Sequence, residues 1–180
     1  MKVEIRNVSS LSKSEMDLMN IWMKKEFGQK YVRKFKEYYP GDAKCFFIIE
    51  KKKIVAFMIL NPVLAEYVGE KYKIFGMGDL VTVRRGEGYG RIMIESVIKY
   101  LKKSGKTGLG FCSRKNTPFY EKVGLKTKTD LMKRFRHQDP KTGRLTPIQN
   151  GDGVFYGGKD NFLDKILKTK HHIYLDTELW

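Results

Sequence analysis

The sequence has few of the residues that build disulfide and metal sites. Only two cysteines, Cys45 and Cys112, and three histidines occur among 180 residues. Both cysteines lie in strand-like apolar runs, which favours buried free thiols and is consistent with a reducing compartment. The adjacent His171 and His172 would point to opposite faces of a strand, an arrangement that chelates metal poorly. We therefore expect no disulfide framework and no bound metal.

Long apolar runs are also absent. No run of about 18 apolar residues occurs, so we expect no membrane-spanning helix and no membrane partner. The segment from Met1 to Arg6 alternates like a first strand and does not read as a signal peptide. A hydrophobic content of 41% fits a folded protein, and 180 residues are enough for one domain with a full core. The expectation is a single cytoplasmic domain.

Acidic residues are scarce relative to basic ones. The chain has 20 Asp and Glu against 36 Lys and Arg, giving a formal net charge of +16. This charge suits an anionic small ligand and equally a nucleic acid. A solvated lysine-rich surface explains it more simply, so we expect no specific nucleic-acid binding. Interleaved basic and aromatic residues from Lys24 to Tyr39 keep a nucleic-acid-binding protein as the alternative.

A glycine-rich turn follows one apolar strand. The run from Leu80 to Val83 enters a turn with glycines at 86, 88 and 90, and a helical pattern of apolar residues follows at once. Glycines let the backbone approach a ligand, and the N–H groups at a helix start attract anions. Arg84, Arg85 and Arg91 add positive charge. No Gly-Lys-Ser/Thr follows, so the turn is not a Walker loop. For the glycines alone, a tight turn that binds nothing is the alternative.

A second motif covers Asn116 to Leu125, after a strand-like run at Leu109 to Cys112. Its sequence is Asn-Thr-Pro-Phe-Tyr-Glu-Lys-Val-Gly-Leu. Asn116 or Thr117 can cap a short helix, Pro118 suits its first turn, and Gly124 suits the position after its end. The sequence therefore predicts a short helix that carries Phe119 inward and presents Tyr120.

The two motifs together resemble the GCN5-related N-acetyltransferases. The order Arg85-x-x-Gly88-x-Gly90 resembles their motif A, and the stretch from Asn116 to Leu125 resembles their motif B. The resemblance implies an α+β fold with a mixed sheet splayed between strands four and five, over a core of about residues 3 to 136. It also implies acetyl-CoA as cosubstrate, with its pyrophosphate on the turn and its pantetheine arm against strand four. The cofactor-binding residues so implied are Leu80, Val81, Val83, Arg85, Gly86, Gly88, Tyr89, Gly90, Arg91 and Asn116. The turn is about two residues shorter than in the common form, which leaves the register of the strand contacts open.

The resemblance implies Tyr120 as the general acid beside the thioester sulfur. Asp79 is the first candidate for the base; its alternative role is a strand-end carboxylate paired with Arg84 or Lys73. Cys112 and Ser113 lack a convincing histidine partner in the sequence, so we expect direct transfer to a primary amine without a covalent intermediate. A coenzyme A-binding regulator without turnover is a further alternative, and Tyr120 argues against it.

The acceptor site is expected beside two helices after the first strand. A capping box at Ser12 to Glu15 begins a helix that ends near Gly28, and Gln29 to Tyr39 is predicted as a second helix. Beyond these helices we predict a hairpin from Cys45 to Leu60 closed by Asn61-Pro62, a strand at 131 to 136, a helix at 160 to 168 and a strand at 172 to 179. The predicted acceptor-binding residues are Trp22, Phe27, Tyr31 and Trp180; the first three also read as core.

The segment from about 137 to 180 is predicted to select the acceptor. The chain shows faint similarity to aminoglycoside 2′-N-acetyltransferases. The similarity lies in Phe119-Tyr120-Glu121 of the second motif and, within this segment, in Thr142-Gly143 with Thr146-Pro147, in Gly151-Asp-Gly-Val-Phe155 and in a terminal Trp. The match is short and gapped, so the acceptor stays open between a small-molecule amine and an amine of a protein or peptide. A homodimer also stays open.

Overall fold

The computed structural model describes residues 1–139, 141–147 and 151–177, which form two compact units. The first unit comprises Met1–Asn61 with Gly78–Val97, and the second comprises Pro62–Met77 with the chain from Ile98 onward. Three elements contribute residues to both units: β3 (Lys53–Tyr67), β4 (Glu70–Thr82) and α3 (Tyr89–Ser104). In the described part of the chain, no helix is long and apolar enough to cross a membrane.

The first unit begins with an antiparallel sheet. Strand β1 (Lys2–Asn7) pairs with β2 (Lys44–Glu50), which pairs in turn with β3 in the predicted hairpin. The hairpin turn places Lys51 and Lys52 at φ 47° and 63°, a left-handed pair that matches the twist of two-residue hairpins. A short 3-10 helix, η1 (Val8–Ser10), follows β1. The core of this unit contains Met19, Met23, Phe35, Phe47, Phe57 and Ile59, all at most 1% exposed.

Helix α1 (Lys13–Phe27) confirms the predicted helix boundaries. The Ser12 side chain accepts from the Glu15 amide, and the Glu15 carboxylate accepts from the Ser12 amide. The helix ends at Gly28, whose φ of 99° few other residues adopt. Capping therefore fixes both ends of α1 from local sequence alone.

The predicted helix from Gln29 to Tyr39 is wrong. The segment forms a 3-10 turn, η2 (Gln29–Tyr31), and a single helical turn, α2 (Phe35–Tyr38), separated by extended backbone at Val32. The Asn20 side chain donates to the Arg33 carbonyl and accepts from the Arg33 amide, both at 2.9 Å. Because both backbone groups of Arg33 are bound by α1, they are not available for a helical ladder.

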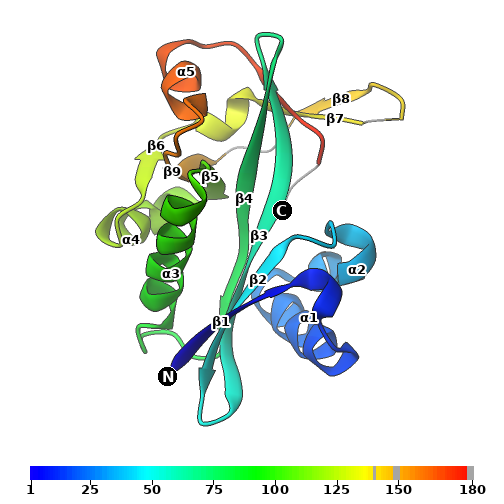
Figure 1. The fold of residues 1–180 in the computed structure, drawn as a ribbon, viewed down its shortest axis with the longest axis vertical. Coiled ribbons are helices and arrows are strands. Elements are labelled where there is room, and N and C mark those ends of the chain that lie inside the picture. Colours follow the sequence, from blue (N-terminus) through cyan, green and yellow to red (C-terminus); the bar gives the residue numbers. More distant parts are fainter. Residues whose placement is uncertain (140, 148–150, 178–180) are drawn as a thin grey trace. The chain divides into compact units, whose positions relative to one another are not determined.

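The second unit has a mixed sheet in the order β6-β9-β5-β4-β3-β10-β7-β8. Strands β4 and β5 pair in parallel, as do β10 and β7, whereas β5 with β9 and β3 with β10 are antiparallel. The mixed sheet confirms the predicted α+β class. Figure 1 shows β7 and β8 as a projecting hairpin. The remaining strands are β5 (Gly108–Cys112), β6 (Lys126–Lys128), β7 (Phe135–Gln138), β8 (Leu145–Pro147), β9 (Asp152–Tyr156) and β10 (Ile173–Leu175).

Two predicted boundaries in this unit need correction. Asn61-Pro62 does not close the hairpin, because β3 continues to Tyr67 with Val63, Ala65 and Tyr67 buried on one face. The predicted strand at 131 to 136 is instead η4 (Leu131–Arg134) followed by β7. The other helical elements are η3 (Arg114–Asn116), α4 (Thr117–Lys122) and α5 (Phe162–Lys168).

Candidate active site

The glycine turn connects β4 to α3 inside the first unit. Gly86 and Gly88 have φ values of 84° and 77°, and a Cβ built on either would meet no atom within 4 Å. The Gly88 carbonyl accepts from the Ile92 amide, so the hydrogen-bond ladder of α3 begins in the turn. Arg85 and Arg91 are exposed beside it. Open backbone, a helix N-terminus and guanidinium groups are what a phosphate ligand requires.

The Tyr89 side chain connects this turn to β2. Its side chain is only 3% exposed, and its hydroxyl donates to the Glu50 carboxylate on β2 at 2.9 Å. Arg84 lies 3.4 Å from the same hydroxyl and 3.8 Å from Glu50. The Tyr89 side chain is therefore part of the packing, and cofactor binding by Tyr89 stays a prediction.

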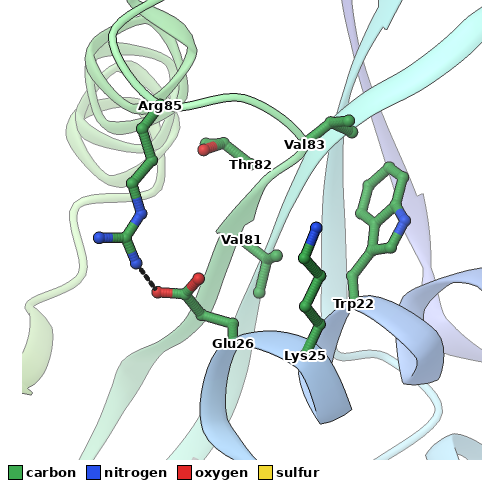
Figure 2. A pocket seen from close by; sticks show the side chains of 7 residues that line it. All are labelled: Trp22, Lys25, Glu26, Val81, Thr82, Val83 and Arg85. Carbon is green, nitrogen blue, oxygen red and sulfur yellow. Dashed lines mark hydrogen bonds and ion pairs between the residues drawn. The ribbon is translucent and has the colours of Figure 1, made fainter.

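A pocket of about 270 Å³ lies between α1 and the end of β4 in the same unit. Figure 2 shows the Arg85 guanidinium reaching the Glu26 carboxylate across it, with Lys25 and Trp22 along α1. Trp22 also stacks on Phe57 with ring centroids 6.1 Å apart. The structure thus brings four predicted residues, Trp22, Val81, Val83 and Arg85, around one cavity. Lys25, Glu26 and Thr82 complete the lining and were not predicted.

The backbone of β4 shows which residues face its neighbour. The Val83 amide donates to the Val55 carbonyl on β3 at 2.9 Å. Because backbone groups alternate sides along a regular strand, we infer from this bond that Val81 also faces β3, whereas Leu80 and Thr82 face away from it. The Val83 amide, on one of the predicted backbone partners of the cofactor, is therefore already bound within the protein. The predicted contacts of Leu80 and Val81 with a cofactor stay predictions.

Asp79 lies at a kink in β4, with φ 53°. Its carboxylate is paired with Arg33 at 2.9 Å, accepts a hydrogen bond from the Tyr39 hydroxyl, and is 6% exposed. Burial raises the pKa of Asp79, and the Arg33 charge opposes that rise. The ion-pair partner is thus Arg33, not Arg84 or Lys73 as the sequence suggested. Arg33 and Tyr39 are 46 and 40 residues away in the chain, and no local pattern indicated them.

Tyr120 lies on α4 in the second unit. Gly124, at φ 95°, ends the helix: its amide donates to the Glu121 carbonyl, and the Leu125 amide donates to the Tyr120 carbonyl. Burial, with a smaller contribution from nearby Cys112, raises the pKa of Tyr120 to about 12. Phe119 is 37% exposed and does not point fully inward, contrary to the prediction.

The remaining predicted residues have mixed outcomes. Asn116 precedes α4 as its N-cap but makes no side-chain cap hydrogen bond. Phe27 and Tyr31 pack against each other, with ring centroids 5.5 Å apart, and lie outside the lining of the pocket described above. Trp180 lies outside the described residues. Cys45 is a buried free thiol, as predicted, and Cys112 is a half-buried one.

The mixed sheet and the open glycine turn between β4 and α3 define a protein with the acyl-CoA N-acyltransferase fold. The family model described as "Acetyltransferase (GNAT) family" matches residues 13–125, and the chain belongs to that family. No curated protein matches the chain significantly.

Several solved structures share the fold at low sequence identity. An acyl-CoA N-acyltransferase from Pseudomonas aeruginosa is 12% identical, with 87% of this chain and 100% of that chain covered and a TM-score of 0.60. The Escherichia coli N-acetyltransferase YhbS, solved in complex with CoA, is 14% identical over 97% and 89% of the two chains, with a TM-score of 0.59. The Campylobacter jejuni N-acetyltransferase PseH, in complex with acetyl coenzyme A, is 14% identical over 87% and 99%, with a TM-score of 0.52.

Proposed function

We propose that this protein transfers the acetyl group of acetyl-CoA to a primary amine. The observation that carries the proposal is the open backbone at Gly86 and Gly88, immediately before α3, in a chain of the GNAT family. Two proteins of similar fold were solved with CoA or acetyl-CoA, which supports the same cosubstrate here. The chain from about residue 137 onward is the proposed acceptor-selecting extension.

The donor would be held mainly by backbone groups. The amides from Gly86 to Arg91 are the proposed pyrophosphate ligands, with Arg85 and Arg91 supplying charge. Leu80 and Thr82 are the proposed strand-like partners of the pantetheine arm, because their backbone groups point away from β3. Asn116 stays a proposed ligand of the cofactor. Acetyl-CoA itself supplies the activated thioester.

Transfer requires two proton movements and a donor for the oxyanion. The attacking amine must lose a proton, and the departing thiolate must gain one. Tyr120 is the proposed donor to the thiolate, since a pKa of about 12 keeps it protonated at neutral pH. Asp79 is the proposed acceptor of the amine proton, acting through a water molecule, because Arg33 and Tyr39 already hold its carboxylate. A backbone amide of β4 is the proposed oxyanion donor.

Mass spectrometry of a mixed panel of amines tests the function. The purified protein is incubated with acetyl-CoA and small-molecule amines in one series, and with peptides in another. We expect acetylated products in one series, with matched reactions that contain CoA in place of acetyl-CoA as the control. Retained CoA binding without acetylation of any amine would favour a non-catalytic CoA-binding protein instead.

Glu26→Gln is expected to tighten CoA binding by about two- to fivefold. In the free protein Glu26 is paired with Arg85, so a phosphate must compete with a carboxylate for that guanidinium. Exposed ion pairs contribute at most about 1 kcal/mol, which sets the upper end of the effect at about fivefold. Calorimetric titration with CoA measures the change.

Glu37→Gln is the matched control for this prediction. Glu37 lies on α2, and its carboxylate is 3.3 Å from the Lys34 ammonium in an exposed ion pair, so the substitution removes the same charge as Glu26→Gln. Equal tightening in both variants would mean that CoA responds to overall charge, and the role of Glu26 as a competitor for Arg85 would be refuted.

A further inference from the structure

Asp152 is a buried carboxylate whose hydrogen-bond and ion-pair partners lie before, at the start of and after helix α4. It lies on β9 and is 3% exposed. Its Oδ2 accepts a hydrogen bond from Thr117 Oγ1 at 3.2 Å and lies 3.5 Å from Arg114 Nε. Its Oδ1 accepts from the Asp130 amide at 2.9 Å. All of these residues belong to the second unit.

These three partners bracket the segment that carries Tyr120. Thr117 is the first residue of α4, Arg114 begins η3 just before it, and Asp130 precedes η4 at φ 57°. A helix of six residues is far too short to be stable alone. Tertiary contacts at its start must therefore fix its direction, and Tyr120 lies within the same first turn as Thr117.

The lowered pKa of Asp152 agrees with a carboxylate that is ionised and held by its hydrogen-bond partners. The hydrogen bond from the Asp130 amide, with help from Arg114 and Thr117 and against the effect of burial, lowers the pKa of Asp152. A buried carboxylate is tolerated when hydrogen bonds and a cation satisfy it. An asparagine in its place would turn an NH₂ group toward donors and lose the attraction to Arg114.

We propose that Asp152 is a positioning residue for acetyl transfer, holding the first turn of α4 so that the Tyr120 hydroxyl keeps its place. The proposal rests on the proposed function, in which Tyr120 protonates the thiolate. Asp152 acts through Thr117 and the helix, and its burial leaves little surface for direct contact with an acceptor. A displacement of about 1 Å in such a group costs up to about 10²-fold in rate.

Asp152→Asn is expected to lower kcat by about 10- to 100-fold while the KM for acetyl-CoA changes by less than about threefold. Asp160→Asn is the matched control. Asp160 also bonds a threonine, accepting from the amide of Thr107 at 2.8 Å and from its Oγ1 at 2.5 Å, but it supports β5 and α5 instead of α4. The control should lose comparable thermal stability with kcat nearly unchanged.

A double-mutant cycle with Tyr120→Phe separates positioning from general structural support. If Asp152 acts through Tyr120, Asp152→Asn should lower kcat by less than about threefold in the Tyr120→Phe background, because coupled residues are not additive. An equal loss in both backgrounds would overturn the proposal, and so would full activity of Asp152→Asn. Should that variant not fold, Thr117→Val takes its place in the same cycle; it removes the hydroxyl that bonds Asp152, together with the 3.8 Å contact of that hydroxyl with Cys112 Sγ.

The proposal that Tyr120 is the general acid can be tested separately from the inference about Asp152. If Tyr120→Phe turns over like the unaltered protein, the assignment of Tyr120 as acid is wrong, and the inference about Asp152 falls with it. If Tyr120→Phe is impaired but Asp152→Asn and Thr117→Val are not, only the inference about Asp152 is overturned.

Discussion

Tyr120→Phe is expected to lower kcat by about 10²- to 10⁴-fold, the usual contribution of general acid catalysis. The substitution keeps the ring and its packing but removes the proton proposed for the leaving thiolate. Burial raises the pKa of Tyr120 to about 12, so the hydroxyl stays protonated at neutral pH and is available as an acid. Steady-state kinetics with the best amine of the panel, together with CoA titration, measures the effect. CoA affinity should change little.

Tyr72→Phe is the control for the loss of a tyrosine hydroxyl. Tyr72 lies in the same unit and donates to Glu70 at 2.5 Å, outside α4. It should leave kcat unchanged. If Tyr120→Phe loses CoA affinity and thermal stability together, Tyr120 is a packing residue and water or another group protonates the thiolate.

The helix boundaries that depend on neighbouring residues could be predicted. The capping box at Ser12, the glycine at 28 and the glycine at 124 each act within a few residues of the helix end they determine. The segment after Gly28 could not be predicted in this way. Its helical periodicity is overridden by Asn20, which binds both backbone groups of Arg33 from 13 residues away.

In the candidate site, too, features that depend on neighbouring residues could be predicted, and those that depend on residues far away in the chain could not. The glycine turn is a local feature, and its residues are visible in the sequence. Apart from Arg84 beside Tyr89, the partners that hold Asp79, Tyr89 and Asp152 lie between 22 and 46 residues away from them in the chain, so only the folded structure brings them together. The strand register also needed the structure, because only the folded chain shows that the Val83 amide is bound by the Val55 carbonyl of β3.

Gly88→Glu is expected to abolish measurable CoA binding. The turn leaves open space at Gly88, with no atom within 4 Å of a built Cβ, so the new side chain would occupy the volume that the pyrophosphate requires. Its carboxylate would also repel the phosphates and compete for Arg85 and Arg91. Calorimetry on the folded variant measures the loss.

A matched control is available at Gly69, in the turn between β3 and β4. Gly69 has the same φ of 77° and the same open surroundings as Gly88. Gly69→Glu should therefore impose the same backbone strain, about 1 to 2 kcal/mol for a residue with a side chain in this region, and add the same charge. If CoA binds Gly69→Glu normally and Gly88→Glu not at all, strain and net charge cannot explain the loss, and the phosphate site is at the turn before α3. Unchanged affinity in Gly88→Glu would instead move the cofactor away from this turn and remove the main support for acetyl transfer.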